Sequence, residues 1–247
     1  KLIICNNCKA INRGERYCHN CGNDLLENKV QDNNEEKTIE FLEAEENLNS
    51  NIEEIEELAF AQNAGKKILI AYFTWADNTF VADPSSVDIN ATTSASVLPP
   101  GDAGLIARWI QEETGGDLFS IITENKFSSD YDECLNKARQ ERDNNERPRL
   151  VGRVNNMNDY DIIFLGFPNW WYTCPMAVFT FLESYNFSGK TIIPFCAHGT
   201  GGLSRTVRDI RRTLPNNVKV LDAIGIYRPE VRNSRNRIIN WVKGLDY

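Results

Sequence analysis

From residue 66 to the end of the chain, short apolar runs alternate with longer segments of helical periodicity. The apolar runs span residues 67–73, 118–123, 161–167, 191–196 and 218–223. The helical segments span residues 104–114, 131–144, 176–184, 203–214 and 231–242. Strands that alternate with helices predict a parallel sheet with helices on both faces. Five such strands predict a doubly wound α/β domain with the strand order 2-1-3-4-5, in which ligands bind at the loops after strands 1 and 3.

The third apolar run ends in a cluster of aromatic residues. A continuous apolar run bounded by turn residues is typical of a strand that is buried on both faces. Three large rings in a row cannot all enter the core where the chain turns, so either one or two ring edges pack under the following helix or the rings form a platform for a flat ligand. The residues available for such a platform are Pro168, Asn169, Trp170, Trp171 and Tyr172.

The loop after the first strand carries hydroxyl and amide groups. Its sequence, TWADNT, lacks the Lys and the Gly spacing of a Walker loop and the GxGxxG pattern. Hydroxyls together with backbone N–H groups at a strand-to-helix turn can hold a phosphate monoester by neutral hydrogen bonds. An ordinary N-cap turn is the alternative, because Thr, Asp and Asn are good caps. The candidate side chains are Thr74, Asn78 and Thr79.

The loop after the fourth strand, CAHGTGGLS, is rich in glycine. Three glycines in four positions indicate that the backbone approaches something closely or adopts positive φ. The N–H groups of such a loop would suit the acceptors on the edge of a flat heterocycle, and a flexible turn into the next helix is the alternative. The candidate residues are Cys196, His198, Gly199, Gly201 and Gly202.

A phosphate turn, an aromatic platform and a glycine-rich edge together describe a flavin mononucleotide (FMN) site. Residues 66–247 resemble the flavodoxin-like family, in particular its bacterial branch, through KILIAYFTWADNT at the first strand and GFPNWWYTCP at the third. The resemblance implies noncovalent FMN, with the isoalloxazine against residues 168–172 and its pyrimidine edge near residues 196–202. It also implies that the phosphate lies at Thr74, Asn78 and Thr79 and that the pocket is lined by Trp75 and Ala76.

Two features depart from the family pattern. Asp77 stands where the family commonly has Gly, and a carboxylate near a phosphate dianion is unfavourable, so we expect it to face solvent or the insertion that follows. That insertion, residues 82–102, is small, polar and Pro-containing. A loop this long is usually functional or mobile. Because it delays the first helix, we expect the phosphate to lose part of the favourable helix dipole.

A separate module is predicted at the start of the chain. Two CxxC pairs separated by nine residues allow four thiolates to converge on one tetrahedral Zn²⁺. Residues 5–25 resemble the short zinc ribbons found at the ends of bacterial proteins, and in so short a segment the metal would supply the folding energy. Two disulfides or a redox pair are the alternatives, which the lack of a surrounding βαβ pattern disfavours. The predicted ligands of this structural zinc are Cys5, Cys8, Cys18 and Cys21.

The charge pattern predicts three parts: a ribbon over residues 1–26, an acidic linker over 27–65 with a helix near 48–59, and the α/β domain over 66–247. Residues 27–63 hold twelve acidic and two basic residues, whereas residues 64–247 are balanced, so the net charge of −8 belongs to the linker. This pattern favours solubility and reach. We expect no nucleic-acid partner, since the main domain has no basic block apart from the Arg-rich stretch 205–212.

The cysteine pattern predicts a cytoplasmic protein. Seven cysteines are present, and the three outside the ribbon form no disulfide framework, which fits a reducing compartment. No apolar run is long enough to cross a bilayer, so we expect no membrane association. We interpret Cys174 and Cys196 as packing residues, because no base stands near them in the sequence.

Three functions are compatible with these features. The first is a flavodoxin-type electron carrier that works with a protein redox partner. The second is an NAD(P)H-dependent FMN reductase that acts on a quinone, a flavin or a similar small-molecule acceptor. The neutral charge of the domain and the long insertion favour this second function. In such an enzyme, His198 would either donate a proton or serve as a hydrogen-bonding loop residue. The third is a redox scaffold or sensor that docks a protein through the ribbon. In each case the cofactor supplies the redox chemistry and the protein tunes it.

Overall fold

The computed structural model describes residues 2–4, 11–13, 65–87 and 96–247. The chain divides into two compact units, Lys1–Glu57 and Leu58–Tyr247. In the first unit, β1 (Leu2–Ile4) pairs with β2 (Ile11–Arg13) in antiparallel fashion. The predicted zinc ligands Cys5, Cys8, Cys18 and Cys21, and the predicted linker helix, lie outside the described residues.

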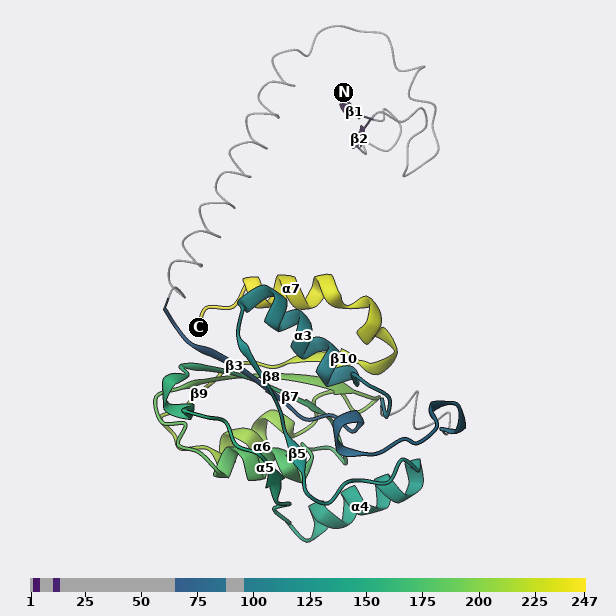
Figure 1. Ribbon diagram of the computed structural model, residues 1–247. Helices are drawn as coiled ribbons and strands as arrows, with labels where there is room; N and C mark the ends of the chain where they lie inside the picture. Colours follow the sequence, from purple (N-terminus) through teal and green to yellow (C-terminus); the bar gives the residue numbers. More distant parts are fainter. Residues whose placement is uncertain (1, 5–10, 14–64, 88–95) are drawn as a thin grey trace, which may run out of the picture. The chain divides into compact units, whose positions relative to one another are not determined.

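The second unit is built on one parallel sheet (Figure 1). Its main path has the order β4-β3-β7-β8-β10, so the five strands, numbered along the chain, follow the predicted 2-1-3-4-5 arrangement. Every pairing within the sheet is parallel, as the alternating pattern predicts. The bounds of these strands are Ile68–Tyr72 for β3, Asp117–Ser120 for β4, Ile162–Pro168 for β7, Thr191–His198 for β8 and Ile224–Tyr227 for β10.

The sheet has six strands instead of the predicted five, because the last one is divided. The segment predicted as one strand over 218–223 forms β9 (Lys219–Val220), and the chain pairs with β8 again only at β10. Asp222 lies in the gap, fully exposed, with its carboxylate 3.3 Å from Arg211. Asp is a poor strand former, and this one is held at the surface by its partner.

The second predicted strand is also shorter than expected. The sheet strand β4 ends at Ser120, and Ile122–Thr123 form β5, which leaves the main sheet and pairs antiparallel with β6 (Leu150–Val151). The apolar run 118–123 therefore contains two short strands, which its hydrophobic pattern alone does not separate.

Helices cover both faces of the sheet, as predicted (Figure 1). On one face pack α3 (Asp102–Thr114) and α7 (Arg235–Lys243), and the short 3₁₀ helix η4 (Arg228–Asn233) precedes α7. The other face is covered by α4 (Tyr131–Asp143), α5 (Met176–Glu183) and α6 (Thr206–Thr213). None of the helices in the described part of the chain has the length and apolarity needed to cross a bilayer.

Strand β7 is buried on both faces, which confirms the interpretation of its apolar run. Ile162 and Phe164 belong to the core under α3 and α7, whereas Ile163 and Leu165 belong to the core on the opposite face. All four side chains are at most 1% exposed. The alternation follows from the two-residue period of a strand.

Gly166 in β7 is required by the packing of the next strand. It lies opposite Phe195 of β8, and a Cβ at Gly166 would come within 2.2 Å of Cζ of that ring. Phe195 is fully buried, so its ring cannot swing into solvent. The glycine therefore lets a large ring lie flat over the centre of the sheet.

We expect Gly166→Ala to lower the free energy of unfolding by about 1–3 kcal/mol, because the new methyl group overpacks the core. Urea unfolding monitored by circular dichroism measures this change. Gly244→Ala is the matched control, since a Cβ there would come no closer than 3.4 Å to its nearest neighbour, Asn240 O. In the double variant with Phe195→Leu, part of the loss should be recovered; a loss that is unchanged by Phe195→Leu would contradict the proposed clash.

Candidate functional site

Two adjoining cavities lie at the edge of the sheet where the parallel strands end. The larger one, which we call the aromatic cavity, has an open volume of about 450 Å³. Its walls come from the ends of β3 and β7, from α4 and from the first residue after β10. The residues that line it are Trp75, Tyr131, Cys134, Leu135, Ala138, Asn169, Trp170, Trp171 and Arg228.

The smaller cavity, which we call the hydroxyl cavity, has an open volume of about 270 Å³. It shares Trp75 and Arg228 with the aromatic cavity, so the two are neighbours. Its walls include two hydroxyl side chains and the N-terminal turn of α3. The residues that line it are Phe73, Thr74, Trp75, Ser96, Asp102, Ala103, Pro168, Ala197 and Arg228.

The start of α3 lies against the end of β3 despite the insertion. The N-cap residue Gly101 has φ of +69°, and a Cβ there would come within 2.9 Å of Thr74 Cβ. Glycine adopts this φ readily and has no Cβ to contact Thr74, so Gly101 allows the helix to approach the loop closely. The sequence led us to expect that the insertion would cost a phosphate part of the helix dipole; in the structure, Asp102 and Ala103 of the first turn line the same cavity as Thr74.

The loop after β3 is folded by its own polar side chains. Thr74 Oγ1 accepts a hydrogen bond from Asp77 N at 3.0 Å, which closes the short 3₁₀ helix η1 (Ala76–Asn78). Asn78 is fully buried, and its amide donates to Thr74 O and Ile121 O. Its Oδ1 accepts from the backbone N–H and the hydroxyl of Thr123. The Asn78 amide thus joins the loop after β3 to residues 121–123 and is occupied by internal hydrogen bonds.

Asp77 points away from the cavities. Its carboxylate accepts a hydrogen bond of 2.5 Å from Ser120 Oγ at the end of β4. Lys126 Nζ donates to the backbone carbonyl of the same residue at 2.6 Å. Asp77 was expected to face solvent or the insertion, and it instead connects η1 to the neighbouring strand. The charge of Asp77 is therefore kept off both cavities.

The three consecutive aromatic residues after β7 have three different environments. Trp170 lies edge-on to Phe73 at 5.4 Å between ring centroids and to Phe127 at 5.2 Å. Trp171 packs against α4, and Tyr172 is 62% exposed. As expected, the three rings do not all enter the core, because the Tyr172 ring is exposed to solvent.

The turn that carries these rings is strained. Trp170 and Thr173 exchange backbone hydrogen bonds of 2.9 and 3.1 Å, and the two residues between them, Trp171 and Tyr172, have φ of +51° and +68°. The left-handed region costs a non-glycine residue about 1–2 kcal/mol. Trp171 Nε1 donates to Leu135 O at 2.9 Å and so anchors the turn to α4. Strain of this kind, held by surrounding contacts, is a feature of functional sites.

Asn169 connects the aromatic loop to the glycine-rich loop. Its Nδ2 donates to Gly202 O at 2.6 Å. Its Oδ1 is buried and lacks a hydrogen-bond partner within the described part of the chain. A buried acceptor without a partner is destabilising, so this atom is available for a donor on a ligand in the aromatic cavity.

Arg228 presents a second buried polar atom without a partner. Its Nε is buried and makes no hydrogen bond to any residue that the structure describes. Arg228 is the first residue after β10, and it lines both cavities. The sequence analysis did not identify it. The fifth strand was predicted to end at residue 223, whereas β10 ends at Tyr227, so the sequence did not place Arg228 at the sheet edge that carries the other loops.

Asp102 lies at the N-terminus of α3 among these groups. Burial raises the pKa of its carboxyl above the ordinary value, while a hydrogen bond from Ser96 and the charges of Arg228 and Arg232 act in the opposite direction. The hydroxyl cavity therefore contains one buried carboxylate under the influence of two guanidinium groups.

The predicted site residues fall into two groups. Those that line a cavity are Thr74, Trp75, Pro168, Asn169, Trp170 and Trp171. Those that line neither cavity are Ala76, Asn78, Thr79, Tyr172, Cys196, His198, Gly199, Gly201 and Gly202. The residues that the sequence analysis missed are Phe73, Ser96, Asp102, Ala103, Tyr131, Cys134, Leu135, Ala138, Ala197 and Arg228.

The members of the second group have roles around the cavities. Thr79 Oγ1 donates to Phe127 O at 2.9 Å, and His198 Nδ1 lies 2.8 Å from Gly199 O, which makes it the donor. Cys196 is fully buried in the core on the face of the sheet that α4, α5 and α6 cover, and burial raises the pKa of its thiol. Burial likewise raises the pKa of Cys174, so both thiols are protonated packing groups.

Comparisons with known proteins agree with this architecture. Residues 91–245 match the family model described as Flavodoxin. The crystal structure of a candidate flavoprotein from Bacteroides uniformis is 25% identical, with a TM-score of 0.54 over 72% of this chain and 99% of that one. A candidate flavoprotein from Bacteroides eggerthii is 24% identical, with a TM-score of 0.49 over 70% of this chain and 97% of that one.

A flavoprotein from Lactobacillus acidophilus, solved in complex with FMN, is 18% identical, with a TM-score of 0.46 over 68% of this chain and 97% of that one. No curated protein matches the chain. The family model covers more than half of the sequence. The structure has the parallel sheet and the strand order 2-1-3-4-5 that are typical of a flavodoxin-like fold. This chain therefore belongs to the flavodoxin family.

Proposed function

We propose that the protein binds FMN at the two adjoining cavities and acts as an electron-transfer flavoprotein. The observation that carries this proposal is the pair of buried polar atoms without partners, Asn169 Oδ1 and Arg228 Nε, which both belong to residues lining the aromatic cavity. Membership in the flavodoxin family and the similarity to the Bacteroides uniformis protein support the same conclusion.

The residues present fit the chemistry of FMN. The aromatic cavity offers apolar and aromatic walls, with a free acceptor at Asn169. Such walls suit a flat ring system whose edge carries polar atoms. The hydroxyl cavity offers Thr74, Ser96 and the first turn of α3. Hydroxyls and helix N-termini are ordinary partners of a phosphate group.

In this proposal each residue has a defined task. Trp75 and Trp170 exclude water from the ring system, and Asn169 Oδ1 accepts a hydrogen bond from it. Trp171 and Leu135 hold the aromatic loop against α4. Bound FMN would supply the electron-accepting and electron-donating chemistry. The exposed Tyr172 places an aromatic side chain at the surface beside the site, where a protein redox partner or a small-molecule acceptor would dock.

We expect the purified protein to bind one FMN per chain and Asn169→Ala to weaken that binding by about 3- to 10-fold, the effect of one neutral hydrogen bond. Titration by quenching of flavin fluorescence measures both affinities. Asn186→Ala is the control, because Asn186 lies before β8, at the opposite edge of the sheet, where its side chain only accepts from Ser188 N. A wild-type protein that leaves FMN unbound would overturn the proposal.

Electron transfer and reductase activity are separated by one assay. We expect the FMN-loaded protein, once reduced by dithionite, to pass electrons to ferricyanide, and not to accelerate oxidation of NADH or NADPH by a quinone above the rate of free FMN. The reason is that a carrier needs an exposed flavin edge and no nicotinamide site. Oxidation of either nucleotide in proportion to protein concentration would instead establish the FMN reductase function.

For the N-terminal unit we propose a structural zinc ribbon that docks a protein partner. The spacing of Cys5, Cys8, Cys18 and Cys21 supports it. The short antiparallel pair β1–β2 provides the kind of hairpin on which such modules are built. A site filled by four thiolates has no open position, so its role is to hold the unit together.

We expect one zinc ion per chain by mass spectrometry of the acid-digested protein, and loss of that zinc in Cys18→Ser, because a four-thiolate site does not tolerate removal of one ligand. Cys174→Ser is the matched control, since Cys174 is a buried cysteine of the other unit and lines neither cavity. Binding of FMN should be the same in both variants and in the wild type. Zinc-free wild-type protein purified without chelators would exclude the ribbon.

A further inference from the structure

Arg228 occupies a position that the structure makes room for. It begins η4, directly after the carboxyl end of β10. A Cβ at Gly199 of the neighbouring loop would lie 2.9 Å from Arg228 Nη2, so the missing side chain at Gly199 leaves space for the guanidinium group. Gly199 is therefore needed to make room for the Arg228 side chain and not for the ligand itself.

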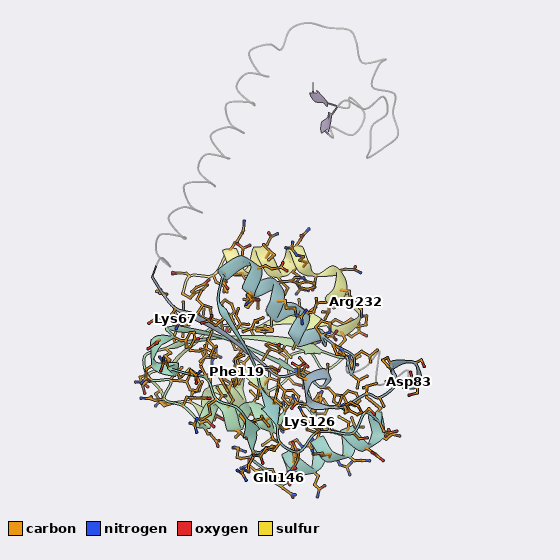
Figure 2. The ribbon with its side chains drawn as sticks, viewed as in Figure 1. Lys67, Asp83, Phe119, Lys126, Glu146 and Arg232 are labelled. Carbon is orange, nitrogen blue, oxygen red and sulfur yellow. The ribbon has the colours of Figure 1, made fainter. Side chains whose placement is uncertain are left out.

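Arg228 also dominates the charge at the site. It is the one basic residue among the described residues that line either cavity. Its charge and that of Arg232 act on the buried Asp102, the one acidic lining residue in the described part of the chain. Figure 2 shows Arg232 at the opposite end of the domain from Lys67, which precedes β3, so both arginines lie toward the carboxyl edge of the sheet.

The surroundings of Arg228 match those of a bound anion. Two hydroxyls, Thr74 and Ser96, line the hydroxyl cavity beside it, together with the first turn of α3. A guanidinium group with a buried, unpaired Nε is costly unless an acceptor completes its hydrogen bonds. Arg binds phosphate oxygens through two parallel charge-assisted hydrogen bonds, whereas the hydroxyls and N–H groups of the phosphate loop carry no net charge.

We propose that Arg228 binds the phosphate group of FMN and makes the site selective for FMN over riboflavin. This inference rests on the proposed function and adds to it a charged determinant from the chain segment after β10. Arg228 offsets the carboxylate of Asp102, and the phosphate then completes the hydrogen bonding of the guanidinium group. Neutral partners at Thr74 and at the helix terminus orient the phosphate, and Arg228 supplies the charge.

The test compares two flavins that differ only in the phosphate. Dissociation constants for FMN and riboflavin are measured by fluorescence quenching for the wild type, Arg228→Gln and Arg228→Lys. We expect Arg228→Gln to weaken FMN binding about 10- to 100-fold, the effect of a hydrogen bond to a charged group, and to leave riboflavin binding within about twofold. The FMN affinity of Arg228→Lys should lie between those of the wild type and Arg228→Gln, because Lys keeps the charge but loses the paired N–H donors of the guanidinium group.

The matched control is Arg211→Gln, since Arg211 on α6 pairs with the exposed Asp222 and lines neither cavity. Equal losses of FMN and riboflavin affinity in Arg228→Gln would show that Arg228 faces the ring system, and would overturn the inference while leaving FMN binding intact. An unchanged FMN affinity would also overturn it. A wild type that binds neither flavin would instead reject the proposed function. Far-ultraviolet circular dichroism confirms that each variant is folded.

Discussion

The parallel pairing of β7 with both of its neighbours is the constraint on which the site depends. Because β3, β7 and β8 run in the same direction and β7 is buried on both faces, their carboxyl ends are forced to one edge of the sheet. Gly166 lets Phe195 cover the centre of that sheet, so the strands stay in register up to the loops. The cavities are therefore a consequence of how the core is packed and not of the loops alone.

Loop residues then convert this edge into a polar and aromatic site. Gly101 brings the start of α3 to Thr74, and Asn78 fixes the η1 turn through four hydrogen bonds. The strained turn at Trp171 and Tyr172 is anchored to α4, which leaves the Tyr172 ring exposed and the Trp171 ring half-buried. Two buried polar atoms, on Asn169 and Arg228, have no partner among the residues that the structure describes. A strained turn and two buried polar groups therefore meet at a site where a ligand could supply the missing hydrogen bonds.

Much of this architecture could be predicted from the sequence, because apolar runs and helical periodicity report burial directly. The parallel sheet, the helices on both faces and the aromatic loop at a strand end are examples. The division of the last strand at Asp222 was missed, because the apolar pattern of the segment outweighed the low strand propensity of Asp. Asn78 was predicted as a ligand from its residue type, yet its amide is committed to internal hydrogen bonds. Arg228 was missed because nothing in its local sequence distinguishes it; only the topology brings it to the site.

The central claim is that the edge formed by β3, β7, β8 and the residue after β10 holds FMN. The most direct measurement is a crystal structure of the protein grown with FMN. The account predicts the isoalloxazine in the aromatic cavity beside Asn169 and Trp170, with its phosphate in the hydroxyl cavity beside Thr74 and Arg228. Electron density for FMN at another surface, or none at this edge in crystals of protein saturated with FMN, would contradict it.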